Sequence, residues 1–191
     1  MSAYNASATK RFFDVVLALV VLPIALPLVV LAFVVVFILS GGPALFIQER
    51  VGLHGKVFRI YKVRTLKNGT ADPMAGMRRD DPHFIPLGRL IRRWRIDELP
   101  QIWNIFKGEM SWVGPRPERP EIVADCMANL PDYSKRHDCL PGITGWAQIH
   151  APNATPEENA EKLVYDLEYV RQASFGQDLK ILFTTVFVMF R

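Results

Sequence analysis

The chain has 191 residues, half of them apolar, and its 23 lysines and arginines exceed its 19 aspartates and glutamates by four. This length fits one domain with its own core and an appended segment, and the mild positive charge argues only weakly for a polyanionic partner, so we expect no nucleic-acid partner. Cys126 and Cys139 lack metal-site spacing, and we interpret both as reduced thiols in a cytosolic compartment.

The first predicted element is an apolar run from Phe12 to Leu39, in which Asp14 is the only charge. A transmembrane helix needs about 20 apolar residues, so the run is long enough to enter a membrane and too long for a usual signal-peptide core. Pro23 and Pro27 lie in its middle, where each removes a backbone donor and crowds the preceding turn. The sequence therefore predicts a membrane helix with a kink or a break near these prolines.

Basic residues flank this run on both sides, and such flanks favour the cytoplasmic face of a membrane. A single straight crossing places only one flank there. A re-entrant helix-break-helix that enters and leaves the same leaflet satisfies both, and we favour it over a kinked single span and over a buried helix of a soluble core. The flanking basic residues are Lys10 and Arg11 before the run, and Arg50, Lys56, Arg59, Lys62 and Arg64 after it.

The chain accordingly divides into three predicted parts. Residues 1–11 form a cytoplasmic N-terminus, residues 12–39 form the re-entrant membrane segment broken near Pro23 and Pro27, and residues 40–191 form a domain on the cytoplasmic face.

Two short strands are predicted after the helix-breaking residues 40–43. They cover 44–48 and 57–63, and the glycines of 52–55 suit a turn that joins them into a small hairpin. The basic side chains of the second strand either form a solvated face or contact phosphate groups. The next stretch, 67–77, has the glycine and proline content of a mobile loop.

Two amphipathic helices are predicted next, because apolar side chains recur at helical spacing and Gly108 suits the end of the second helix. Asp97 stands where the second helix begins, with Glu98 and Pro100 in its first turn, a pattern typical of a helix N-cap. A helix N-terminus also attracts phosphate, so this stretch alone leaves a cap and a reacting carboxylate as alternatives. The apolar positions are Leu87, Leu90, Ile91 and Trp94, then Leu99, Ile102, Trp103 and Phe106.

Two turn-rich segments follow. In "SWVGPRPERPEI", prolines bracket Arg116, and a rigidly placed guanidinium binds phosphate well; a proline-rich linker is the alternative. In "LPGITGWAQIHAPNA", Gly142 and Gly145 allow either close backbone approach to a ligand or simple tight turns.

The tail contains a predicted acidic helix at 156–171 and an apolar end, 178–191, that is too short to span a membrane comfortably. We interpret this end as an interfacial or buried helix. The predicted fold class is therefore α+β, with a re-entrant N-terminal membrane segment, a small β-hairpin and several amphipathic interfacial helices.

Taken in order, several motifs resemble those of the bacterial sugar transferases, the monotopic phosphoglycosyl transferases. The resemblance runs from Lys10 to Thr185, and the chain is similar to the minimal catalytic form of that family. The motifs are "KRFFD", "FRIYKVRT", "RRWRIDELPQIWNIFKGEMSWVGPRPE", "RHDCLPGITGWAQI" and "YDLEYVRQASFGQDLKILFTT".

This resemblance implies an enzyme that moves a sugar-1-phosphate from a UDP-sugar to a polyprenol phosphate such as undecaprenyl phosphate, with release of UMP. It implies Mg²⁺ as cofactor, membrane lipids as partners, and a place at the cytoplasmic face of the bacterial inner membrane. The reaction would be the first membrane step of a bacterial glycan pathway, such as exopolysaccharide or glycoconjugate biosynthesis. A homo-oligomer is compatible with these features.

The resemblance also implies roles for individual residues. Asp97 would attack the sugar-proximal phosphate and form a covalent phosphosugar-aspartate, and Glu98 would act beside it and hold Mg²⁺. Because a carboxylate must approach an anionic diphosphate, cationic groups are needed to neutralise the charge. The implied phosphate-binding residues are Arg116, Arg92, Lys62 and Arg64.

Two positions depart from the family pattern. Leu26 precedes Pro27 where relatives often have serine, and Leu140 stands where many have a basic residue, with Arg136 or His137 as candidate replacements. Two other functions share the arginines and the acidic pair: a membrane-associated UDP-sugar hydrolase, and a non-enzymatic protein that binds anionic lipid.

Overall fold

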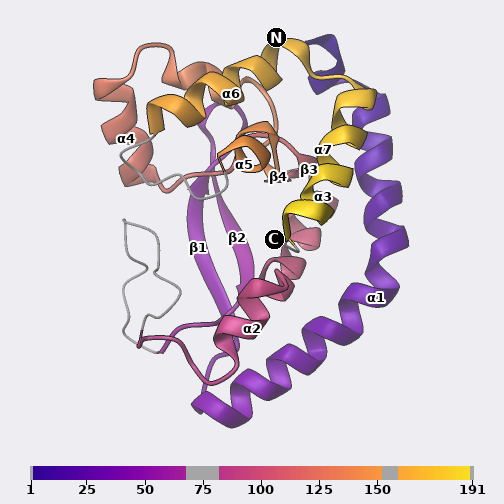
Figure 1. Cartoon of the computed structure of the whole chain (residues 1–191), viewed down its shortest axis with the longest axis vertical. Coiled ribbons are helices and arrows are strands. Elements are labelled where there is room, and N and C mark those ends of the chain that lie inside the picture. The colour runs from indigo at the N-terminus through magenta and orange to yellow at the C-terminus, as the bar shows by residue number, and fades with distance from the viewer. Residues whose placement is uncertain (1, 68–81, 152–158, 190–191) are drawn as a thin grey trace.

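The computed structural model describes residues 2–67, 82–151 and 159–189. Within them the predicted α+β organisation is confirmed: one long helix, two small two-stranded sheets and several shorter helices (Figure 1). The described elements are η1 (Ala3–Ala6), α1 (Ala8–Ser40), β1 (Leu45–Val51), η2 (Leu53–Gly55), β2 (Val57–Val63), α2 (Gly88–Arg93), η3 (Ile96–Gln101), α3 (Ile102–Lys107), β3 (Ser111–Val113), α4 (Pro120–Asn129), η4 (Tyr133–Asp138), β4 (Gly142–Thr144), α5 (Trp146–His150), α6 (Asn159–Gln172) and α7 (Phe175–Met189).

The long helix α1 begins after Ser7, whose hydroxyl accepts a hydrogen bond from the Lys10 amide, and ends at Ser40, followed by Gly41 in the left-handed conformation. Pro23 and Pro27 lie inside it, and Figure 1 shows that the helix changes direction partway along. The interruption predicted at the prolines is therefore a bend within one continuous helix. The re-entrant path through a membrane stays a prediction.

The surface of α1 separates it from the core helices of soluble proteins. Only 17% of its most apolar 18-residue window is buried. Large apolar side chains are left exposed along its length, among them Phe12, Val20, Ile24 and Ile38. A helix of this length and composition suggests membrane association, because exposed apolar surface on this scale is unfavourable in water.

The first turns of α1 are fixed to the rest of the domain by buried polar contacts. Lys10 Nζ lies 2.7 Å from Asp178 Oδ2 of α7 and 3.1 Å from the Val113 carbonyl of β3. Arg11 donates to the Phe106 carbonyl at the end of α3, over 2.8 Å. The start of α1 is thus joined to α3 and β3, the two elements that lie between the acidic pair and Arg116 in the sequence.

The predicted hairpin is confirmed, with a longer first strand than expected. β1 and β2 pair antiparallel from Leu45 opposite Val63 to Val51 opposite Val57. Buried Phe58 and Ile60 of β2 pack with Ile102 of α3 in one apolar cluster. This packing places the second strand beside the segment that carries the acidic pair.

A second sheet was not predicted from the sequence. β3 and β4 pair in parallel, and glycines in or next to these strands bring two main chains into direct contact. A Cβ at Gly142 would lie 2.1 Å from the Gly114 nitrogen, and one at Gly145 would lie 2.2 Å from the Gly114 carbonyl oxygen. These glycines therefore serve backbone-to-backbone packing, which neither of the two predicted alternatives described.

We expect Gly142→Ala to lower the free energy of unfolding by about 1–3 kcal/mol or more, because the added methyl group meets main-chain atoms that cannot rotate away. Thermal unfolding of the purified protein measures the effect. Gly176→Ala in α7 is the matched control, since its Cβ meets no atom within 4 Å and alanine favours a helix. Equal melting temperatures for the two variants would contradict this packing.

The remaining predictions for the fold have mixed outcomes. α6 begins at Asn159, and residues 156–158 of the predicted helix lie outside the described residues, as do 68–77 of the predicted loop. The predicted C-terminal helix is α7, on which Phe183 and Phe187 are exposed. The interfacial placement of the helices stays a prediction. Both cysteines are free and buried, in agreement with reduced thiols.

Candidate active site

The acidic pair lies in a 3-10 turn that follows a sharp reversal of the chain. α2 ends at Arg93, and Arg95 adopts the left-handed conformation with φ 52°. Asp97 and Glu98 then occupy the first turn of η3, and both are buried. The prediction that Asp97 is an N-cap is wrong: Arg95 holds that position, because the turn begins two residues earlier than the apolar pattern indicated.

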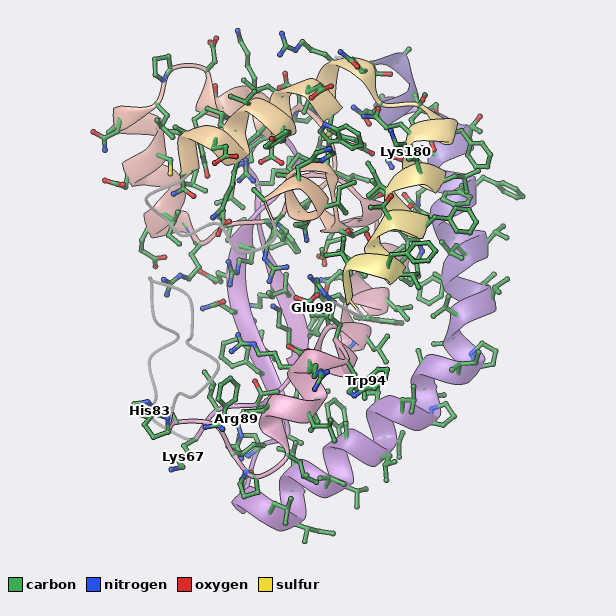
Figure 2. All side chains as sticks on the ribbon, viewed as in Figure 1. Lys67, His83, Arg89, Trp94, Glu98 and Lys180 are labelled. Atoms are coloured by element: carbon green, nitrogen blue, oxygen red, sulfur yellow. The ribbon has the colours of Figure 1, made fainter. Side chains whose placement is uncertain are left out.

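A cavity of about 340 Å³ opens above this turn, in the size range of small-molecule sites. Figure 2 shows Glu98 near the centre of the molecule. The lining of the cavity holds more cationic side chains than carboxylates, and this excess of positive charge suits a polyanionic ligand. The lining residues are Lys62, Arg92, Arg95, Asp97, Glu98, Arg116, Glu118, Arg136, Ala147, Gln148, Ala151, Lys162 and Asp166.

Three cations hold Glu98. Its Oε1 lies 3.1 Å from Arg116 Nη2 and 3.4 Å from Lys62 Nζ, and its Oε2 lies 3.0 Å from Arg95 Nη1. Burial alone would raise the pKa of Glu98, but Arg116, then Lys62 and Arg95, outweigh it and hold the pKa well below its usual range. Glu98 therefore stays ionised and fixes the cations around it.

Asp97 has the opposite environment. Its side chain is buried, and its Oδ1 has no hydrogen-bond partner within the described part of the chain. Burial raises the pKa of this carboxyl to about 6, with a further increase from Glu98 and an opposing effect from Lys62. Neighbouring carboxylates with divergent pKa values are a frequent feature of catalytic sites. Asp97 is the one whose charge is least compensated by fixed partners.

The structure brings together five of the six predicted site residues. Lys62, Arg92 and Arg116 line the cavity together with the acidic pair. Arg64 does not line it in the described structure; its guanidinium donates to the Ser40 hydroxyl at the end of α1. Side chains two residues apart share a face only while a strand continues, and β2 ends at Val63. A role for Arg64 in phosphate binding has no support from this placement.

Sequence reasoning missed several lining residues. Arg95 lies two residues before Asp97, but its left-handed conformation gave no sequence signal, since arginine rarely adopts it. Asp166 pairs with Arg136 across 30 residues, Arg136 Nη2 lying 2.7 Å from Asp166 Oδ2. No local pattern reveals such a pair. Arg136, one candidate replacement for a basic residue at Leu140, does line the cavity, while His137 is not part of its described lining.

Comparison with known proteins gives one consistent result. The family described as "Bacterial sugar transferase" matches residues 5–191. The chain is 37% identical over 179 residues to the Aeromonas hydrophila "UDP-N-acetylgalactosamine-undecaprenyl-phosphate N-acetylgalactosaminephosphotransferase". It is 39% identical over 185 residues to the Komagataeibacter xylinus "Undecaprenyl-phosphate glucose phosphotransferase", and 42% identical over 181 residues to the Bacillus subtilis (strain 168) "Uncharacterized sugar transferase EpsL".

These matches differ in how much of each relative they cover. Each match includes 93% of this chain. The chain spans only 42% of the length of the Aeromonas protein and 35% of the length of the Komagataeibacter protein. The Bacillus protein is covered over 85% of its length.

Proposed function

Because this chain belongs to the bacterial sugar transferase family, we propose that it is a phosphoglycosyl transferase that moves a sugar-1-phosphate from a UDP-sugar to a polyprenol phosphate. The observation that carries the proposal is a buried Asp97 carboxylate, whose Oδ1 has no hydrogen-bond partner among the described residues, in a cavity with an excess of cations. The names of two relatives, which pair a sugar phosphotransferase with undecaprenyl phosphate, support the choice of acceptor.

In the first proposed step, an Asp97 carboxylate oxygen attacks the sugar-proximal phosphorus of the UDP-sugar. The new bond joins that oxygen to phosphorus, the bond to the bridging oxygen breaks, and UMP leaves. In the second step, the polyprenol phosphate oxygen attacks the same phosphorus and releases Asp97, forming a polyprenyl diphosphate sugar. Two displacements allow the soluble donor and the lipid acceptor to use one site in turn.

Charge neutralisation is the main task of the surrounding residues. The half-exposed Arg116 guanidinium extends to Glu98, so its remaining N–H groups are available to a phosphate. Lys62 and Arg92 line the same cavity, and their charges oppose the rise in the pKa of Asp97. Fixed cations of this kind stabilise charge in a transferring phosphoryl group without reorganisation.

The carboxylates of this site could hold the proposed Mg²⁺ only together with oxygens of the substrate phosphates. Among the described residues no group of three potential metal ligands occurs, and both Glu98 oxygens already face cations. The partnerless Asp97 Oδ1 is a suitable donor beside Glu98, and Mg²⁺ commonly binds one or two carboxylates together with substrate phosphates. When bound there, the ion would supply positive charge to the diphosphate.

The membrane context of the proposal rests on α1. We place the domain at the cytoplasmic face of the bacterial inner membrane, with α1 entering and leaving one leaflet around Pro23 and Pro27. The bend of α1 and the exposed apolar side chains of α1 and α7 support this placement. A cavity near the headgroup region would meet the phosphate of a polyprenol, as the first membrane step of a glycan pathway requires.

A panel of UDP-sugars, with UMP detection and with Mg²⁺ present, tests the reaction class. We expect UMP release with at least one donor and a polyprenyl diphosphate sugar when polyprenol phosphate is added. Multiple turnovers without the lipid would instead indicate a hydrolase. Absence of UMP with every donor, while the protein still binds anionic vesicles, would favour a lipid-binding protein and contradict the proposal.

The raised pKa of Asp97 predicts a pH dependence of the first step. Below about pH 6 the carboxyl is protonated and cannot attack phosphorus, so the single-turnover rate of UMP release should fall about tenfold per pH unit there and level off above it. Rapid-quench measurements between pH 4.5 and about 8 check this. An acidic limb centred near 4, the usual aspartate value, would contradict the assigned environment.

A further inference from the structure

The loop that carries Arg116 is held by its carbonyl oxygens. The Pro115 carbonyl accepts from the Gly142 amide at 3.0 Å, and the Glu118 carbonyl accepts from the Val51 amide at 2.9 Å. Between them, the Arg116 carbonyl accepts from Arg136 Nη2 at 2.9 Å, and the Pro117 carbonyl accepts from Arg50 Nη1 at 3.1 Å. Four consecutive carbonyls are thus bound by donors from elsewhere in the fold.

This arrangement follows from the two prolines. Pro115 and Pro117 have no N–H group, so main-chain carbonyls provide most of the loop's hydrogen-bonding capacity. A buried arginine is a suitable donor to such a carbonyl, because its planar guanidinium carries several N–H groups in a fixed geometry.

Arg136 is placed between the loop and α6. It is 5% exposed, and its Nε and Nη2 both donate to Asp166 Oδ2, at 3.0 and 2.7 Å. Its Nη1 donates to the Tyr133 hydroxyl at 3.2 Å. With the bond to the Arg116 carbonyl, four of its N–H groups are committed, so its capacity for direct contact with a substrate phosphate is small.

We propose that Arg136 is a positioning residue for the transfer: anchored by Asp166, it holds the Arg116 main chain and so keeps the Arg116 guanidinium beside Glu98, over the reacting centre. This inference rests on the proposed function and adds a residue that acts through Arg116. The connected contacts are Asp166 Oδ2 to Arg136, Arg136 Nη2 to the Arg116 carbonyl, and Arg116 Nη2 to Glu98 Oε1 at 3.1 Å.

The test is a double-mutant cycle on the single-turnover rate of UMP release from an active UDP-sugar. Arg136→Lys keeps the charge, but one ammonium group cannot reproduce the planar contacts to both Asp166 and the Arg116 carbonyl. We expect the rate to fall about 10- to 100-fold with the KM for the donor nearly unchanged, because a small misplacement of a clamp affects the transition state most. Repeated in an Arg116→Ala background, the same replacement should lower the rate less than about twofold.

Two further variants keep the test decisive. Arg171→Lys is the control: Arg171 is exposed on α6 and donates to the Leu167 carbonyl of its own helix, so full activity is expected. If Arg136→Lys unfolds below the assay temperature, Asp166→Asn is used in its place. The Asp166→Asn variant weakens the ion pair that anchors Arg136 but retains the Arg136 side chain. It should give a loss of rate that again disappears in the Arg116→Ala background.

The outcomes separate the two proposals. Equal losses in both backgrounds, or a raised KM with an unchanged rate, would show that Arg136 acts independently of Arg116 and would overturn the inference alone. A wild-type protein that releases no UMP from any donor would overturn the proposed function, and this inference with it.

Discussion

Replacement of Asp97 by asparagine is expected to abolish the first step, with UMP release reduced by about 10⁴-fold or more. The amide is close in size to the carboxylate but has no anionic oxygen with which to attack phosphorus. Because burial and Glu98 raise the pKa of Asp97 despite the nearby cations, removing its charge should also leave the fold at least as stable at neutral pH. The expected result is therefore an inactive protein with an unchanged or raised melting temperature.

The control for this variant is Asp125→Asn, which alters an exposed carboxylate on α4. It should retain full activity. Coupled detection of UMP and thermal unfolding, performed on both variants, separate loss of the nucleophile from loss of the fold. Wild-type turnover by Asp97→Asn would remove Asp97 from the proposed mechanism.

Arg116→Lys is expected to lower the rate of UMP release by about 10²- to 10³-fold, the range observed when one stabilising donor is lost from a transition state. Lysine keeps the positive charge but lacks the planar set of N–H groups that contacts Glu98 and a phosphate oxygen together. The loss should be in kcat more than in KM. Initial rates across a range of donor concentrations measure both.

The same exposed residue used above, Arg171, provides the matched arginine-to-lysine control. Arg116 also has a second contact in the cavity, because it is the main group that holds the pKa of Glu98 low against the effect of burial. If Arg116→Lys has wild-type kcat, the cavity needs no guanidinium at this position, and the clamp assigned to Arg116 is wrong.

Several features of the fold follow from local sequence. The apolar run with two prolines predicted the long, bent α1, and the glycines at 52–55 predicted the hairpin of β1 and β2. The sequence motifs predict the acidic pair and Arg116 as site residues, and in the structure Glu98 and Arg116 form an ion pair. Most of that success came from the ordered motifs rather than from composition or periodicity.

Other features had no local signal. β3 and β4 have three residues each, too few for an alternating pattern, and their parallel pairing depends on contacts between distant glycines. The placement of Arg64 depended on where β2 ends, which strand periodicity does not determine. Boundaries and long-range contacts, rather than residue types, were therefore the limit of the sequence analysis.

The most direct test of the account is mass spectrometry of the protein after brief exposure to an active UDP-sugar without polyprenol phosphate. We predict a mass increase equal to the sugar-1-phosphate less one water, localised to the peptide that contains Asp97, and its disappearance when polyprenol phosphate is added. The Asp97→Asn protein should show no increase. Full UMP release by the wild-type protein with no adduct, or with an adduct on another residue, would contradict the covalent role of Asp97.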